Sequence, residues 1–337
     1  MTTPSPAQRM SSEIDLSVLV VSWNVRDLLA DCLASIAAGP VTLIAPDGTL
    51  HGEGGLLTEV IIVDSASSDG TPDLVRERFP WATLITCEQN VGFTRGNNLA
   101  LARARGRHLL LLNPDTVVHD DALPALVHHL DTHPEVGIAG PRVLNADGST
   151  QSTRRRFPTP LTAFVESTWL QGHAPRRFLD HYYVTDQPDD DICEVDWVQG
   201  CALIARRAVY KQIGGLDEGY VMFSEELDWC RRARQAGWRV HYVGTARITH
   251  YGGQSTGQVE TRKHIYFQQS KLRYFRKYHG RTFAFALRWF LLVSYAWQLL
   301  LEAAKGLLGH KRALRRARVR TYWAVLGALA LGRRPGE

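Results

Sequence analysis

Four consecutive leucines at positions 109–112 run directly into Asn113, Pro114 and Asp115. A continuous apolar run that ends in a turn signal is typical of a buried central strand, and proline ends such a strand because it cannot donate to the ladder. Asp115 is therefore expected at the carboxyl end of a strand, where open α/β sheets bind their ligands. An acid held there can bind a divalent cation, although a simple turn is the commoner use of this tripeptide.

Other apolar runs along the chain end in polar turns in the same way. We expect strands over residues 16–24, 59–64, 82–86, 136–141 and 238–243, and a strand pair or bent strand over 195–205 that Gly200 interrupts. Helical apolar spacing and capping signals predict helices over 27–38, 99–104, 122–130, 207–213 and 225–236, with one more opening at Pro72. This alternation predicts an α/β fold with a parallel sheet whose polar turns share one crevice. The glycine-rich residues 39–57 are expected to form a surface insertion, in which a small hairpin would fit.

Both ends of the chain depart from this alternation. Residues 1–13 are polar and predict a disordered N-terminus without the apolar core of a signal peptide. Residues 282–301 are apolar but include Arg288, which favours a helix lying at a membrane surface over one that spans it. A basic cluster over 305–320 follows, and it suits the anionic inner face of the cytoplasmic membrane. A helical pair packed on the rest of the chain, or on a second copy in a homodimer, is the alternative.

The net charge and the cysteine content indicate in which compartment the protein works and which partners it has. The formal charge is +5, and because the basic excess lies in the C-terminal tail, we expect no nucleic-acid partner. The five cysteines are odd in number and lack paired metal-ligand spacing, which favours a reducing compartment. We therefore expect a cytoplasmic protein that is peripheral on the inner face of the cell membrane.

Seven polar stretches occur in an order that carries a family resemblance: residues 21–24, 63–71, 90–98, 111–115, 214–217, 225–228 and His250. Through them the first 255 or so residues resemble an inverting family 2 glycosyltransferase, similar to bacterial rhamnosyltransferase-like members. The resemblance implies the GT-A fold, the Rossmann-like, mostly parallel sheet of nucleotide-diphospho-sugar transferases, over residues 14–258. Residues 259–337 would then form an amphipathic, basic helical extension that associates with a membrane.

The resemblance implies a donor site for a nucleotide-diphosphate sugar. Asp64 and Asp69 would receive the base and ribose, since carboxylates accept from imide N–H groups and sugar hydroxyls. Capping of the helix that follows Gly70 is an equally good interpretation of Asp69. A turn around Gly92, Arg95 and Gly96 would let backbone approach the nucleotide and a guanidinium meet phosphate, unless it is only a glycine-bearing loop that ends a strand. The remaining donor-side candidates are Ser22, Asn24, Ser67, Asn113 and Asp115.

The resemblance also implies a divalent cation, Mg2+ or Mn2+. Asp115 matches the last acid of the family's metal-binding triplet, whereas Asn113 stands where many members carry the first acid. One protein carboxylate suffices if diphosphate oxygens and water complete the coordination. His250 matches the position that often supplies a second ligand or a phosphate contact, although a lone histidine is more often structural.

The catalytic base is expected among Glu225, Glu226 and Asp228. Inversion by direct displacement needs one general base that takes the proton of the acceptor hydroxyl. Glu226 is our first candidate, and because it replaces the family's usual aspartate, Glu225 or Asp228 is the alternative. The simplest interpretation is that these acids only favour a helix N-terminus, and neighbours in a helix diverge too far for all three to face one way. On the acceptor side the resemblance points to Asp196, Trp197 and Gly200, although core packing is the commoner fate of a tryptophan.

The expected reaction is transfer of a sugar, with L-rhamnose from dTDP-rhamnose as first choice, to a lipid-linked or cell-wall polysaccharide acceptor. One alternative is a non-catalytic scaffold with the same fold. Another is a nucleotide-sugar enzyme of a different class, such as a dehydrogenase. The dehydrogenase is disfavoured because no Gly-x-Gly-x-x-Gly follows the first strand.

Overall fold

The computed structural model describes residues 14–119, 121–252, 260–309 and 311–331. The expected N-terminal disorder, over residues 1–13, lies outside this range. Eleven strands form one large sheet in the order β10-β13-β8-β12-β6-β1-β4-β2-β3, with β5 beside β4 and β7 beside β13. Its strands are β1 (Leu16–Ser22), β2 (Val41–Ile44), β3 (Leu50–His51), β4 (Leu56–Asp64), β5 (Thr83–Thr86), β6 (His108–Leu112), β7 (Thr116–Val118), β8 (Val136–Leu144), β10 (Ile192–Val195), β12 (Ala202–Arg206) and β13 (Arg239–His250).

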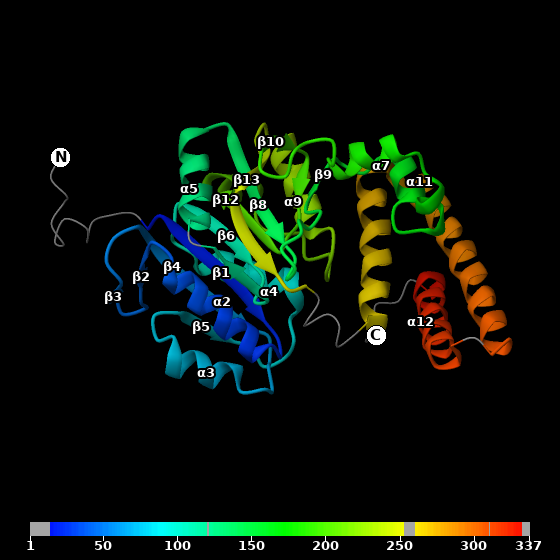
Figure 1. The fold of residues 1–337 in the computed structure, drawn as a ribbon, viewed down its shortest axis with the longest axis horizontal. Coiled ribbons are helices and arrows are strands. Elements are labelled where there is room, and N and C mark those ends of the chain that lie inside the picture. The colour runs from blue at the N-terminus through cyan, green and yellow to red at the C-terminus, as the bar shows by residue number, and fades with distance from the viewer. Residues whose placement is uncertain (1–13, 120, 253–259, 310, 332–337) are drawn as a thin grey trace.

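The helices lie on both faces of this sheet and beyond one end of it (Figure 1). A separate pair of short strands, β9 (Arg154–Arg155) and β11 (Trp197–Val198), is antiparallel. The helices are α2 (Arg26–Ala38), α3 (Thr71–Arg78), α4 (Gly92–Arg103), α5 (Ala122–Thr132), α6 (Pro160–Val165), the 3-10 helix η1 (Trp169–His173), α7 (Arg176–Tyr183), α8 (Arg207–Ile213), α9 (Glu225–Gln235), α11 (Glu260–Leu307) and α12 (Arg312–Leu331).

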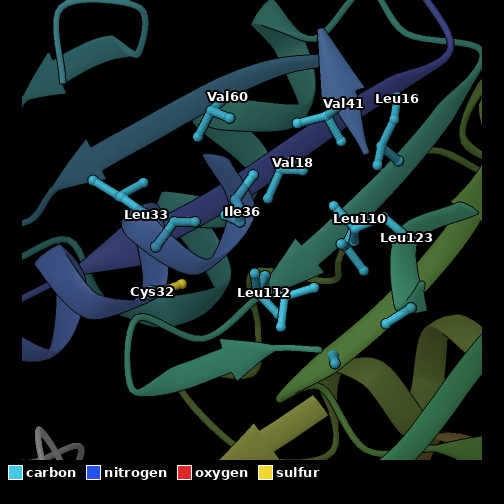
Figure 2. Packing of buried hydrophobic residues seen from close by; sticks show 14 of the residues in the cluster. Leu16, Val18, Cys32, Leu33, Ile36, Val41, Val60, Leu110, Leu112 and Leu123 are labelled. Carbon is cyan, nitrogen blue, oxygen red and sulfur yellow. The ribbon is translucent and has the colours of Figure 1, made fainter. Parts of the chain in front are cut away.

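The leucine run is the central strand β6, as predicted, and all five of its residues are buried. Successive side chains of a strand point to opposite faces, so its leucines divide between two cores. Leu110 and Leu112 join the cluster under α2 and α5, which Figure 2 shows, whereas Leu109 and Leu111 join the cluster under α4 and α9. Each fully buried leucine contributes roughly 1.5–3 kcal/mol to folding. The strand is therefore fixed in register on both faces, and so is the turn at its carboxyl end.

The sheet is mixed, because the later strands reverse direction. β1, β4 and β6 are parallel to one another, whereas β12 is antiparallel to both β6 and β8. The expected surface insertion over residues 39–57 is corrected in part. Its hairpin exists, but β2 runs parallel to β4 in the main sheet, and Val41 and Leu43 are buried in the core. The β-branched and leucine side chains of β2 outweigh the glycines around it.

The C-terminal helices share a core with the α/β part. Ile265, Tyr274 and Phe275 of α11 belong to the same buried cluster as Leu203 of β12 and Trp229 of α9. The helix α11 turns back on itself at Gly280, whose φ of 86° is a left-handed conformation that glycine adopts at little cost. In Figure 1 its yellow first half therefore stands against the sheet domain, while its orange second half pairs with α12 in red. Among the described residues, the helix over Thr261–Leu307 is long and apolar enough to cross a membrane, by length and composition only.

Candidate active site

A cleft of about 740 Å³ opens at the carboxyl ends of β1, β4 and β6. The turns after these strands line one side of it, and the start of α9 lines another, as expected for ligand loops gathered at one sheet edge. The beginning of α11 closes the cleft from the C-terminal part of the chain. The residues that line it are Val21, Ser22, Trp23, Ser65, residues 90–93, Asn113, Pro114, Asp115, Gln199, Gly200, Cys201, residues 221–223, Glu225, Glu226, His250, Arg262, Lys263 and Tyr266.

Ser22 and Asp64 lie opposite each other where the parallel strands β1 and β4 end. Both side chains are buried, and one Asp64 oxygen accepts from the backbone N–H of Ser67 at 3.0 Å. The Ser22 hydroxyl and the other Asp64 oxygen, Oδ1, have no hydrogen-bond partner among the described residues. Such buried polar atoms are rare in folded proteins and are commonly satisfied by a ligand or water.

Asn24 and Ser67 hold the two neighbouring turns together. The backbone N–H of Asn24 donates to the Ser67 hydroxyl at 3.0 Å, and the side-chain Oδ1 of Asn24 accepts from the backbone N–H of Ser68 at 2.8 Å. Asn24 has a φ of 52° and Ala66 a φ of 60°, uncommon values for residues with a side chain. Asn24 and Ser67 thus fix the turns next to Ser22, which lines the cleft, although neither they nor Asp64 are among the lining residues.

Asp69 fits its alternative interpretation, the helix cap. Its Oδ1 accepts from the backbone N–H and the hydroxyl of Thr71 at the start of α3, and its Oδ2 accepts from the backbone N–H of Arg26. Burial alone would raise the pKa of Asp69, but these hydrogen bonds outweigh it and lower the pKa. Both oxygens thus serve the fold, as the capping interpretation expects, while the ribose contact stays a prediction.

The expected turn around Gly92, Arg95 and Gly96 is the first part of helix α4, which begins seven residues earlier than predicted. The carbonyl oxygen of the Asn90 side chain accepts from the Gly92 N–H at 2.9 Å and so begins the helix. A Cβ on Gly96 would lie 2.7 Å from Val21 Cγ1, so this glycine allows α4 to pack against β1. Arg95 is exposed and does not line the cleft. Of the three, only Gly92 reaches the cleft.

Asp115 and His250 meet although 135 residues separate them, because β7 and β13 are paired beside the cleft. Asp115 Oδ1 lies 3.3 Å from His250 Nε2, and Asn113 Nδ2 lies 3.2 Å from the same nitrogen. On the other side of the ring, His250 Nδ1 lies 3.1 Å from Gln151 Oε1, while Gln151 Nε2 donates to the His250 carbonyl at 2.6 Å. Because an amide oxygen can only accept, Gln151 selects the tautomer with the proton on Nδ1. The lone pair of Nε2 is then turned toward Asp115.

This pair of side chains fits a divalent cation. Two ligand atoms that bind a metal at right angles, each with a bond of roughly 2.1 Å, lie about 3 Å apart. Asp115 Oδ1 and His250 Nε2 have a similar separation, 3.3 Å. Among the described residues there is no group of three or more His, Cys, Asp or Glu side chains that could hold a metal without help. A cation at this place therefore needs oxygens from a bound ligand and from water.

Glu225 and Glu226 begin helix α9 after a strained turn. Phe223 and Ser224, the two residues before them, have φ values of 69° and 65°, and consecutive left-handed residues that are not glycine cluster at functional sites. Both glutamates line the cleft, and within the described chain neither Glu225 Oε2 nor Glu226 Oε2 has a hydrogen-bond partner. A Cβ on Gly200 would lie 3.5 Å from Glu226 Cβ, so this predicted acceptor-side residue packs against the glutamate.

Burial raises the pKa of both glutamates. The pKa of Glu225 lies well above its ordinary value because burial is reinforced by the negative charge of Glu226. Burial also raises the pKa of Glu226, but hydrogen bonds from backbone N–H groups, including those of Leu227 and Gly200, act in the opposite direction and lower it. Cys201 lies in the same cleft, but burial raises its pKa to about 12, which keeps it a thiol rather than a nucleophile. The arrangement provides carboxylates suited to accepting a proton.

Asp228, the third acid of this stretch, faces away from the cleft and is fully buried. It accepts from Lys277 Nζ at 2.6 Å, Tyr278 OH at 2.8 Å and Arg232 Nε at 2.8 Å. Lys277 also reaches Asp217 at 3.0 Å. The suggestion that Asp228 serves as the base is corrected: it fastens α11 to α9, because a turn of 3.6 residues places it on the opposite side of the helix from Glu226.

Asp196 and Trp197 also lie outside the cleft lining. Asp196 Oδ2 accepts from the backbone N–H of Phe157 at 2.7 Å, and the Trp197 indole is buried and donates to the Arg156 carbonyl at 3.0 Å. The expected acceptor contacts of these two residues are corrected to structural ones. Of the three predicted acceptor residues, the structure places only Gly200 at the cleft.

Sequence reasoning missed several cleft-side residues, among them Gln151, Arg262, Lys263 and Tyr266. Gln151 lies outside every strand, helix and motif predicted above, and the other three belong to a helix expected to be separate from the site. No local pattern marks them, because each reaches the site through the packing of distant elements. The positive charges of Arg262 and Lys263 are the only signal that could have drawn attention to them.

A mixed sheet with a parallel core, with this cleft at the carboxyl ends of its parallel strands and a helical extension after it, defines a GT-A glycosyltransferase. Two solved structures share the fold, each with a TM-score of 0.53. One is the mannosyltransferase PcManGT from Pyrobaculum calidifontis in complex with GDP-Man and Mn2+, 18% identical, with 95% of this chain and 87% of that chain covered. The other is GalNAc-T7 with UDP, GalNAc and Mn2+, 14% identical, with coverage of 79% and 48%.

The chain belongs to glycosyl transferase family 2, whose model matches residues 17–213. It is 26% identical over 279 residues to the N-acetylglucosaminyl-diphospho-decaprenol L-rhamnosyltransferase of Mycobacterium tuberculosis, covering 80% of this chain and 88% of that protein. It is also 26% identical over 204 residues to the rhamnosyltransferase WbbL of Escherichia coli, covering 54% of this chain and 69% of WbbL. The predicted family, fold and rhamnosyltransferase resemblance are thus confirmed.

Proposed function

We propose that this glycosyltransferase moves L-rhamnose from dTDP-rhamnose to a lipid-linked acceptor, with inversion and with the help of a divalent cation. The names of the two rhamnosyltransferase relatives support the sugar, and the decaprenol-linked substrate in the mycobacterial name supports the acceptor class. The observation that carries the proposal is the set of polar atoms that have no protein partner, within the described residues, at one cleft. Ser22 Oγ, Glu225 Oε2 and Glu226 Oε2 belong to residues that line the cleft, and Asp64 Oδ1 is buried beside it, one residue before the lining residue Ser65.

The donor nucleotide belongs at the β1 and β4 end of the cleft. Asp64 Oδ1 is free to accept from an imide N–H or a ribose hydroxyl, and the Ser22 hydroxyl can donate or accept beside it. Asp115 and His250 would hold Mg2+ or Mn2+ at the diphosphate. The cation would neutralise negative charge that develops on the leaving diphosphate. Both structural neighbours contain Mn2+ together with a nucleotide or nucleotide sugar, which supports this assignment.

Glu226 is the proposed general base. It takes the proton of the acceptor hydroxyl as that oxygen forms a bond to the anomeric carbon, while the bond from that carbon to the diphosphate oxygen breaks. The products are the inverted glycoside, protonated Glu226 and the nucleoside diphosphate. Glu225 is the alternative base in the same cleft. Its raised pKa makes it the weaker candidate, because it stays protonated to a higher pH.

The second half of α11 is the proposed membrane-contacting face. Phe285, Trp289, Val293, Trp297 and Leu300 repeat at helical spacing, and each is more than half exposed. The exposed bases Lys305, Lys311, Arg312, Arg316 and Arg320 follow, as suits an anionic inner leaflet. Arg288 does not disturb this face, because it donates to the carbonyls of Leu329 and Ala330 at the end of α12. We include the first half of α11 in the catalytic unit, since it lines the cleft.

Flotation of the full chain with vesicles tests the membrane assignment. We expect binding to phosphatidylglycerol vesicles, weaker binding to phosphatidylcholine vesicles, and loss of binding when Trp289 and Trp297 are both changed to serine. Equal recovery of both proteins, together with a dimer that only the unaltered chain forms, would assign the face to a second copy instead.

The test of function is a panel of nucleotide sugars, each incubated with the full chain with and without Mn2+. We expect dTDP-rhamnose to be consumed faster than UDP- or GDP-linked sugars, and only with the cation, with NMR of the product giving the anomeric configuration. Turnover of another donor would correct the sugar. Absence of turnover with every donor would favour the non-catalytic scaffold.

A further inference from the structure

A second cavity, of about 560 Å³, lies beside the first. It is lined by η1, by both halves of α11 and by α12. The two cavities share Phe223 and Lys263 as walls, so the second one lies directly beside the reaction cleft, on the side of the C-terminal helices. Nothing in the donor chemistry above uses it.

Aromatic rings form much of its wall. The rings of Phe223 and Phe267 meet edge to face at 5.7 Å between centroids, and those of Tyr295 and Tyr322 do so at 5.6 Å. Trp169 of η1 is half exposed and adds a fifth ring. Aromatic faces of this kind pack against the flat C–H faces of ring-shaped ligands.

Polar groups stand between these rings. Gln268 is buried, and its Nε2 donates to the Tyr295 hydroxyl at 3.0 Å. Its Oε1 has no hydrogen-bond partner in the part of the chain that the structure describes. If the amide is turned the other way, its nitrogen is the atom left unpaired, so the side chain offers a free polar atom in either orientation. Ser294 and Gln298 add a hydroxyl and an amide to the lining.

This combination of aromatic rings and polar groups favours a sugar over an isoprenoid chain as the ligand of the cavity. An isoprenoid would cover the amides, the hydroxyls and the Lys263 ammonium without offering a hydrogen bond to any of them, which costs free energy at each group. A sugar ring satisfies the free amide with its hydroxyls and stacks on the aromatic faces. We propose that this cavity is an acceptor subsite that binds a second sugar residue, so that the enzyme extends an acceptor glycan of at least two sugars.

The proposal rests on the transfer reaction above, because the acceptor must place one hydroxyl at Glu226. A glycan whose terminal sugar lies at Glu226 would pass Phe223 and Lys263, the shared walls, and set its next sugar in the second cavity. Binding of that second sugar contributes to recognition of the acceptor without touching the reacting atoms. Its removal should therefore change KM rather than kcat.

The experiment compares water-soluble alkyl glycosides that carry one, two or three sugars, with the full chain, dTDP-rhamnose and Mn2+. We expect kcat/KM for the two-sugar acceptor to exceed that for the one-sugar acceptor at least tenfold, and the third sugar to add little. Equal values for one and two sugars would overturn the proposal.

Two variants locate the effect. Trp169→Ala and Gln268→Leu are expected to raise KM about tenfold for the two-sugar acceptor and to leave the one-sugar acceptor within twofold. Trp323→Ala, an exposed tryptophan of α12 outside the cavity lining, is the matched control and should change neither. A parallel loss on both acceptors would overturn the subsite. So would an effect of Trp169→Ala that follows the length of the alkyl chain, which would assign the cavity to lipid.

A binding measurement keeps this inference separate from the proposed reaction. If no acceptor takes up sugar, the reaction has failed, but saturation-transfer NMR of the same glycosides still reports on the cavity. We expect signals from the two-sugar glycoside that disappear in Trp169→Ala and persist in Trp323→Ala. Signals that are absent from the unaltered chain, or that persist in Trp169→Ala, would overturn the subsite.

Discussion

The cleft and the junction between α9 and α11 use the same residue types in opposite ways. In the cleft, Glu225 and Glu226 each keep one oxygen without a partner among the described residues. At the junction, two residues further along the same helix, Asp228 accepts from Lys277, Tyr278 and Arg232. The difference teaches that a buried carboxylate with all its donors supplied by the protein serves the fold, whereas an undersupplied one has capacity left for a ligand.

The two regions also depend on each other. The strained turn at Phe223 and Ser224 persists only if its surroundings hold it, and α9 is held there by the Asp228 contacts to α11. Substitutions in the cleft should therefore affect activity without lowering stability, and substitutions at the junction should affect stability first. Four predictions test this separation, from the largest expected effect to the smallest.

Glu226→Gln should lower kcat by about 1,000-fold, the usual contribution of a general base, while the melting temperature does not fall. In the unaltered enzyme the pKa of Glu226 is raised, so activity should fall with decreasing pH at a value above that of an ordinary glutamate. Steady-state kinetics across pH and thermal denaturation provide the two measurements. If Glu225→Gln abolishes transfer instead and Glu226→Gln does not, the roles of the two glutamates are reversed.

Asp228→Ala should lower the free energy of unfolding by about 3 kcal/mol, because it removes a fully buried carboxylate and leaves Lys277, Tyr278 and Arg232 without their shared acceptor. Urea denaturation measures this value. Asp217→Ala is the matched control: Asp217 binds the same Lys277 but is partly exposed, as are Arg273 and Lys277, so it should cost about 1 kcal/mol or less. Similar costs for both variants would contradict the assignment of Asp228 as the buried anchor.

Gln151→Leu should raise the Mn2+ concentration needed for half-maximal activity roughly 10-fold, because the partner that orients a metal-binding histidine usually contributes 10- to 100-fold to affinity. Gln212→Leu is the control, since Gln212 accepts from the Trp238 indole outside the cleft lining and should leave the Mn2+ dependence unchanged. A loss of kcat in Gln151→Leu at every Mn2+ concentration, without a shift in the midpoint, would remove His250 from the cation site.

Glu225→Gln should give the smallest effect, a gain in stability that grows with pH. The pKa of Glu225 is raised on folding, so the folded state favours the protonated form. Protonated Glu225 therefore stabilises the folded state at a pH below the pKa that Glu225 has in the unfolded chain. This stabilisation is lost as the pH rises through the pKa that Glu225 has in the folded state, and the glutamine variant, which cannot ionise, avoids the loss. Melting temperatures of both proteins at pH 5 and pH 8 test this, and a gain that is larger at pH 5 would contradict the direction.

Much of the fold follows from local sequence. The leucine run, the polar turns and the helical spacing predicted the order of most strands and helices, because those signals act between neighbouring residues. The prediction failed where packing outweighs local composition. Glycine-rich flanks did not stop Val41 and Leu43 from entering the core, and two glycines did not stop α4 from starting at Gly92, since the tight contact of Gly96 with Val21 needs the helix there.

The candidate site was predictable in part for the same reason. Asp64, Asp115 and Glu226 lie at ends of elements that the sequence marks, whereas Gln151 and Lys263 reach the cleft through contacts between distant segments. No pattern along the chain indicates that the first half of α11 forms a wall of the cleft.

The sequence by itself determined that Asp115 ends a buried strand, because four leucines followed by Asn113 and Pro114 allow little else. It also determined that three acids open α9. Only the tertiary structure decided which of these acids keep an oxygen that can bind a ligand. Lys277 and Tyr278, about 50 residues further along the chain, donate hydrogen bonds to Asp228. Glu226 Oε2 has no hydrogen-bond partner in the described chain. The physical reason is that the capacity of a carboxylate to bind a ligand depends on which donors already surround it, and those donors come from the packing of distant helices.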